Sequence, residues 1–184
     1  MEEYITKANG RPFDSSRLNP GFISDEDYRT IHEKSVIPCH DIYVECEHNG
    51  NKGILLVARK EVPCAGQLWP LGGRILKGVP IQESVKRKVK EESRLEAFDI
   101  QELGVARVIL DEDRFGHGRG YDSIAVNYFV RSQGNLELNN LHENPTIVNW
   151  RNYEQIEKNL HPYVRRFLRE AMRKWTTESI TSSS

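Results

Sequence analysis

The residues best suited to chemistry lie in the stretch 71–95, which joins a glycine-rich turn to a pair of carboxylates. The turn is Gly-Gly-Arg at residues 72–74, and the pair is Glu91 and Glu92. A glycine-rich turn that leads into a helix can present backbone amides and a helix N-terminus to an anion. Adjacent carboxylates can hold a hard cation such as Mg²⁺ through oxygen ligands. An anion-binding turn and a cation site within one short segment suggest chemistry on a diphosphate.

A helix is predicted to follow the turn and to position both carboxylates. Pro80 suits its first turn, because proline has no amide hydrogen to leave unpaired there. Ile81, Val85 and Val89 then recur at every fourth residue, which indicates one apolar face that packs inward.

Lys88 is unfavourable for the binding of a cation on this helix. It precedes Glu91 by three residues and Glu92 by four, so it can form ion pairs with them and fill the space of a cation. The segment also carries more basic than acidic side chains. An alternative interpretation is that Arg87, Lys88, Glu91 and Glu92 form an ordinary solvated face of ion pairs.

Strands and helices surround this segment in an order typical of an α/β fold with a mixed sheet between two helical layers. Strands are predicted at residues 40–47, 53–59, 123–131 and 146–150, and within 98–111, most clearly at 105–110. Flanking helices are predicted at 25–34 and 162–175. Tyr28 and Ile31 are expected to face inward. The glycine-rich residues 115–120 predict a hairpin tip or a mobile lid.

The composition limits the classes of protein to which this chain can belong. The chain has 184 residues, 38% of them hydrophobic, and a net charge of −1, which argues against a general binder of nucleic acid or anionic membranes. Its longest apolar run, residues 54–58, is too short to span a bilayer, and residues 1–11 lack the apolar core of a signal peptide. Three cysteines without metal-ligand spacing indicate reduced thiols and a cytoplasmic location. The N-terminal arm could cross to a second subunit of a homodimer.

Residues 73–95 resemble the Nudix box, G-x5-E-x7-R-E-U-x-E-E-x-G-U, where U is aliphatic. An ungapped match aligns Gly73, Arg87, Val89, Glu91, Glu92 and Leu95. Val79, Lys88 and Arg94 depart from the box, and Lys88 replaces a glutamate that is usually a principal metal ligand in the family. The resemblance implies a Nudix-type α/β/α sandwich over residues 37–176 that uses Mg²⁺ or Mn²⁺. Residues 1–36 would then form an N-terminal arm and helix, and residues 177–184 a flexible tail.

The flanks of the box resemble the GDP-mannose mannosyl hydrolase branch of this family. The matching features are the strand DIYVE at 41–45, the run LLVAR at 55–59, Trp69, the Gly-Gly-Arg turn and Lys77. Enzymes of that branch break the sugar C1–O bond, so one cation and several arginines can neutralise the diphosphate leaving group. The match implies that Asp41 contacts the substrate and that Arg59 and Arg74 hold the diphosphate. It also implies that the Gly72 carbonyl joins Glu92 as a metal ligand.

The match leaves the general base open. A Gln-His pair that precedes an aromatic residue in that branch falls on Asn144 and Pro145, counted back from Trp150. Asn144 could offer an amide oxygen to a metal, whereas Pro145 cannot accept a proton. His142 and Glu143 are the nearest available bases. Further alternatives are Asp111, Glu112 and Asp113.

Two hypotheses of different classes follow. In the first, the chain is a Mg²⁺-dependent hydrolase of a nucleoside diphosphate-linked small molecule, such as the nucleotide sugar GDP-mannose. The metal ligands would be Gly72, Glu91, Glu92 and Asn144, and the catalytic residues Arg74, Arg87, Glu91, Glu92, His142 and Glu143. In the second, it is a catalytically silent Nudix domain that binds a nucleotide-like ligand or a partner, with Lys88 in the place of the metal.

Overall fold

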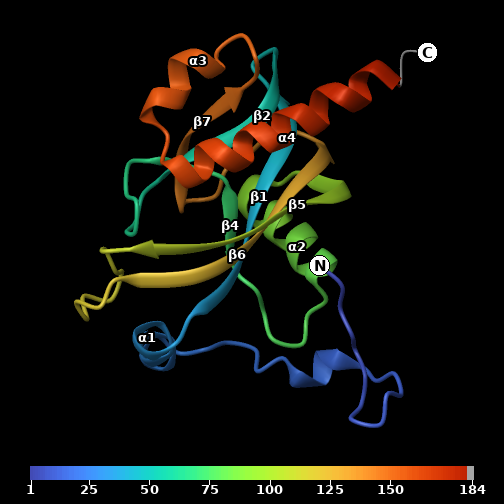
Figure 1. Cartoon of the computed structure of the whole chain (residues 1–184), viewed down its shortest axis with the longest axis vertical. Helices are drawn as coiled ribbons and strands as arrows, with labels where there is room; N and C mark the ends of the chain where they lie inside the picture. The colour runs from blue at the N-terminus through green and yellow to red at the C-terminus, as the bar shows by residue number, and fades with distance from the viewer. Residues whose placement is uncertain (182–184) are drawn as a thin grey trace.

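The computed structural model describes the backbone of residues 1–181 and the side chains of residues 1–176. Its centre is a mixed seven-stranded sheet (Figure 1). The strands are β1 (Ile37–His48), β2 (Asn51–Arg59), β3 (Leu68–Trp69), β4 (Leu71–Arg74), β5 (Glu96–Leu110), β6 (Tyr121–Gln133) and β7 (His142–Val148). The main path runs β3-β2-β1-β6-β5, while β4 pairs with β1 and β7 with β2. β1 and β6 are parallel, and the other pairs are antiparallel.

Helices cover both faces of the sheet. Helix α2 (Ile81–Ser93) lies on one face, and α4 (Pro162–Thr181) with the short α3 (Tyr153–Ile156) lies on the other (Figure 1). Helix α1 (Asp25–Lys34) and the 3₁₀ turn η1 (Ser15–Leu18) belong to the N-terminal arm, and the 3₁₀ turn η2 (Glu157–Asn159) follows α3. The predicted α/β class with a mixed sheet is thereby confirmed. Residues 177–181 of the predicted tail continue α4, and residues 182–184 lie outside the described residues.

Alternation along the central strands divides the core in two. Ile42 and Val44 of β1 pack with the apolar stripe of α2, whereas Tyr43 between them packs with α4. Successive side chains of a strand point to opposite faces, and both faces of β1 and β2 are covered. This explains why β2 reads as a continuous apolar run rather than an alternating one.

Helix α2 forms where the apolar spacing predicts it. Ile81, Val85 and Val89 are buried, as expected. Pro80 stands at the N-cap, one residue before the predicted position, and Arg94 ends the helix with a left-handed backbone at φ 60°. The carboxylate of Glu3 accepts hydrogen bonds from the Ile81 amide at 3.0 and 3.1 Å, so the N-terminal arm supplies the cap that proline cannot.

The prediction that Tyr28 and Ile31 of α1 face inward holds for Tyr28 and is wrong for Ile31. Ser24 caps this helix by accepting a hydrogen bond from the Asp27 amide at 3.1 Å, and Tyr28 is partly buried. Ile31, however, is 38% exposed, and His32 is 5% exposed instead. Helix α1 does not pack on the main core. It contacts an aromatic cluster near the β5–β6 loop through residues four apart, which turns Ile31 outward.

Several strand boundaries also differ from expectation. The first strand begins at Ile37, β5 begins at Glu96 and β6 at Tyr121. The last strand is β7 at His142–Val148 rather than residues 146–150. A register shift between Leu56 and Ala58 lets β7 continue along β2, so that His142 pairs with Arg59. His142 therefore belongs to the sheet and not to a free loop.

Two simpler observations complete the fold. Cys39, Cys46 and Cys64 are buried free thiols, in agreement with the reduced state that the sequence indicates. In the part of the chain that the structure describes, no helix is long and apolar enough to cross a membrane.

Candidate functional site

A pocket of about 330 Å³ opens beside β4. All seven strands, helix α2 and the loop after β2 contribute to its wall, and α1 with Arg114 of the β5–β6 loop closes one side. Its charged and titratable wall includes Asp41, Arg59, Arg74, Lys88, Glu92 and His142. The fold thus brings together predicted site residues from four distant parts of the chain, and Gly72 is one of them.

Four predicted site residues do not line this pocket. Arg87 and Glu91 pair with each other on the surface of α2, with Arg87 Nη1 at 2.6 and 2.7 Å from the two carboxylate oxygens. Glu143 and Asn144 are exposed on β7. Adjacent residues of a helix point about 100° apart, so α2 can turn only one of its two terminal carboxylates into the pocket, and that one is Glu92.

Glu92 is held by contacts on both of its oxygens. Its Oε1 lies 3.2 Å from Lys88 Nζ and its Oε2 lies 3.1 Å from His142 Nε2. The Gly72 amide also donates to Oε2 at 3.3 Å. Burial alone raises the pKa of Glu92, but His142 and Lys88 outweigh that effect and hold the pKa below its ordinary value. The carboxylate is therefore ionised at neutral pH.

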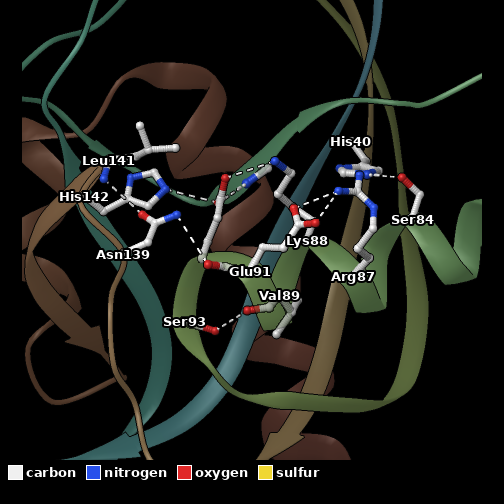
Figure 2. Close-up of polar contacts among 12 residues, drawn as sticks. His40, Ser84, Arg87, Lys88, Val89, Glu91, Ser93, Asn139, Leu141 and His142 are labelled. Carbon is white, nitrogen blue, oxygen red and sulfur yellow. Dashed lines mark hydrogen bonds and ion pairs between the residues drawn. The ribbon is translucent and has the colours of Figure 1, made fainter. Parts of the chain in front are cut away.

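A buried histidine, His40, links strand β1 to helix α2, which carries Lys88 and Glu92. His40 Nε2 lies 2.9 Å from Ser84 Oγ, which ties β1 to α2 (Figure 2). Burial, with a smaller contribution from the Lys88 charge, lowers the pKa of His40 to about 4. His40 is thus a neutral structural group. It also restricts Gly72, because a Cβ there would lie 2.4 Å from the His40 carbonyl oxygen.

Asp41 is a second carboxyl group in the wall, 9% exposed and bonded to helix α4. Tyr163 Oη lies 2.6 Å from Asp41 Oδ2 and 2.8 Å from Asn127 Oδ1. The Asn127 amide group donates to the Ala125 carbonyl, so its oxygen faces the tyrosine. One hydroxyl proton cannot serve two acceptors, whereas a protonated Asp41 can donate to Tyr163 while Tyr163 donates to Asn127. Burial raises the pKa of Asp41 to about 6, although the Tyr163 contact and the Arg59 charge act in the opposite direction.

A family model described as the NUDIX domain matches residues 44–172, which is most of the chain. The chain belongs to the Nudix family. The sequence resemblance is thereby confirmed at the level of the superfamily. No curated protein matches the sequence.

Solved structures of Nudix proteins share this fold. The NUDIX domain of Shewanella oneidensis NrtR, complexed with ADP-ribose, is 17% identical with a TM-score of 0.60, covering 83% of this chain and 99% of that one. The MutT protein of Methanosarcina mazei is 24% identical with a TM-score of 0.58, covering 77% of this chain and 96% of that one. A Caenorhabditis elegans Ap4A hydrolase is 13% identical with a TM-score of 0.53, covering 77% and 99%. At these identities the likeness concerns the fold, and the mannosyl hydrolase branch stays a prediction.

Nudix hydrolases generally use divalent cations such as Mg²⁺, and the residues of this pocket do not fit one. A hard cation needs several oxygen ligands. The single buried carboxylate of α2 is already in contact with an ammonium group, an imidazole and an amide. In the described part of the chain, no three histidine, cysteine, aspartate or glutamate side chains are grouped to hold a metal ion. Lys88 thus stands at the box position of a metal ligand and brings a positive charge itself.

Some residues of the site could not be found from the motif. Tyr163, His40 and the pocket residues of α1 reach the site only through long-range contacts. The inward orientation of Glu92, in contrast, could have been predicted from the sequence. At 3.6 residues per turn Glu92 falls about 20° from Ile81 on the helix, and Glu91 about 80° away. The apolar stripe therefore already indicated which glutamate faces inward.

Proposed function

We propose that the pocket binds a nucleoside diphosphate-linked small molecule and that the Lys88 ammonium serves in place of a divalent cation. The observation that carries this proposal is the contact between Lys88 Nζ and the buried Glu92 carboxylate at 3.2 Å. The ion pair fixes the ammonium at the pocket wall, where the side chain of Lys88 is 18% exposed. A fixed positive charge in a partly desolvated pocket attracts phosphate oxygens more strongly than one in water.

Two arginines supply further positive charge for a diphosphate. Arg59 and Arg74 both line the pocket. Arg74 Nη1 is buried, and no described residue is its hydrogen-bond partner. A guanidinium group with open donors matches phosphate oxygens in a bidentate manner. ADP-ribose, present in the similar NrtR domain, is a ligand of the proposed class.

The proposal is tested by calorimetric titration of ADP-ribose into the protein in the presence of EDTA. Wild-type protein should bind it, and Arg74→Ala should weaken binding about tenfold or more, the usual cost of a lost charged hydrogen bond. The matched control is Arg151→Ala, which removes an exposed arginine outside the pocket. Failure of the wild type to bind any of a panel of nucleoside diphosphate derivatives would reject the proposal.

Lys88 itself can be tested through metal binding. Lys88→Glu restores a carboxylate at the box position and should create stabilisation by Mg²⁺, seen as a rise in melting temperature. The wild-type melting temperature should not respond to Mg²⁺. A wild type that is stabilised by Mg²⁺ as strongly as the variant would show that the ammonium does not hold the cation's place.

A second candidate function is the hydrolysis of a nucleotide sugar such as GDP-mannose, as the branch resemblance implies. It is favoured by His142, whose Nε2 lies 3.1 Å from Glu92 Oε2 on the pocket wall. A carboxylate beside an imidazole can orient the ring and stabilise its protonated form, which suits a general base. In this candidate Arg59 and Arg74 would stabilise the diphosphate leaving group, and the roles of Arg87, Glu91, Glu143 and Asn144 are not part of the proposal because these residues do not line the pocket.

Turnover separates the two candidates. The protein is incubated with a nucleotide-sugar panel and Mg²⁺ or Mn²⁺ in ¹⁸O water. Label in the sugar would identify attack at carbon, label in the phosphate would identify attack at phosphorus, and His142→Gln should abolish either. Binding without turnover across the panel would reject hydrolysis and leave the binding function.

A further inference from the structure

Helix α1 contributes to the pocket although it precedes the matched residues 44–172. Tyr28 and His32 of this helix are part of the pocket wall. Figure 1 shows α1 away from both helical layers, below the end of the β5–β6 hairpin. The helix therefore has a role outside the main core, and its position is explained by two contacts.

The first contact joins Tyr28 to Arg74. The guanidinium carbon of Arg74 lies 4.5 Å from the centroid of the Tyr28 ring. The ring is itself supported edge-on by Phe115 at 5.6 Å and His32 at 6.1 Å. The Nη1 of Arg74 is buried without a hydrogen-bond partner among the described residues. An aromatic face can hold a guanidinium plane and leave its N–H edges free.

The second contact fastens α1 to the β5–β6 loop. His32 Nδ1 lies 2.9 Å from His117 Nε2. The Arg119 amide donates to His117 Nδ1 at 3.1 Å, so a neutral His117 carries its proton on Nε2 and donates it to His32. Asp113 fixes this loop, because its carboxylate accepts from the amides of residues 115, 117 and 118 at 3.0 Å each.

We infer that Tyr28 is a positioning residue for Arg74 and that the His32–His117 contact holds α1 in place, so that the N-terminal helix completes the anion-binding wall of the pocket. A long arginine side chain loses rotamer freedom when it binds an anion. Stacking on Tyr28 removes that freedom before the ligand arrives, which strengthens binding without using a donor. The ligand part of this inference rests on the proposed function, whereas the position of Arg74 can be measured without any ligand.

The ligand-free test is NMR spectroscopy of the Arg74 Nε–Hε group, assigned by its absence in Arg74→Lys. Its proton should carry a ring-current shift that Tyr28→Leu removes and Tyr28→Phe retains. The matched control is Tyr4→Leu, which removes a tyrosine that is 78% exposed on the arm. An unchanged Arg74 resonance in Tyr28→Leu would overturn the inference.

The binding test uses ADP-ribose as the probe. Tyr28→Leu should weaken its binding about twofold to thirtyfold, the range of a cation–π contact, and Tyr28→Phe should restore most of the affinity. In an Arg74→Ala background Tyr28→Leu should have no further effect, and an equal loss there would overturn the inference. His117→Gln, a residue outside the pocket wall, should shift the Arg74 resonance by releasing α1. If wild-type protein binds no ADP-ribose, the proposed function fails and the NMR result alone decides the inference.

Discussion

Replacement of Asp41 by asparagine is expected to stabilise the folded protein at neutral pH. Asp41 is buried, and Tyr163 and Asn127 surround it with a hydrogen-bond network that a neutral side chain satisfies. Asparagine has nearly the same shape, and its amide group can donate to Tyr163 Oη as a protonated aspartate would. The variant therefore keeps the network and removes the cost of a buried negative charge.

The magnitude follows from the pKa of Asp41, which burial raises from 3.8 to about 6. One pKa unit corresponds to about 1.36 kcal/mol, so the two-unit rise amounts to about 3 kcal/mol. The folded-state pKa lies above the unfolded-state value, so the folded protein holds the proton more tightly. Stability is then lost as the pH rises from about 4 to about 6, and wild-type protein carries the full cost above that window.

Urea unfolding at several pH values measures this effect. At pH 8 the free energy of unfolding of Asp41→Asn should exceed that of wild type by about 3 kcal/mol, and the gain should fall below about 1 kcal/mol by pH 4. Glu47→Gln on the exposed end of the same strand is the matched control and should show no such pH-dependent gain. A variant no more stable than wild type at pH 8, or equally favoured at both pH values, would refute the reasoning.

Two further predictions concern buried histidines. Burial lowers the pKa of His32, with His117 and Arg114 acting in the same direction and Asp113 against them, so docking of α1 should be complete above the ordinary pKa near 6.5 and weaken as pH falls below it. Hydrogen exchange of α1 amides, corrected for intrinsic rates, should be faster at pH 5 than at pH 7.5, and equal protection would contradict this. Ser84→Ala leaves His40 Nε2 buried without its partner and should cost about 1–3 kcal/mol in urea unfolding. A loss below about 0.5 kcal/mol would show that the contact contributes little.

Much of the fold could be predicted because its signals are local. The stripe of Ile81, Val85 and Val89 and the apolar run of β2 each identify an element from neighbouring residues. Their assembly into a mixed sheet with helices on both faces then follows from how such elements bury their apolar surfaces. The predicted inward turn of Ile31 failed because α1 packs on a loop far away in the chain.

The candidate site was predictable only in part, for the same reason. Gly72, Arg74 and Glu92 belong to one continuous motif, so the sequence placed them together. His142 reaches the site through a register shift between β2 and β7, which no local pattern signals. Tyr28 and Arg74 are far apart in the sequence, and their cation–π contact does not depend on any fixed spacing of residues. The sequence therefore did not predict this contact.

The most direct test of the central claim is a calorimetric titration of ADP-ribose into wild-type protein, carried out once in EDTA and once in excess Mg²⁺. With the Lys88 ammonium beside Glu92, the two titrations should give the same dissociation constant within about twofold. Binding that occurs only in Mg²⁺ would contradict the assignment of the cation's role to Lys88.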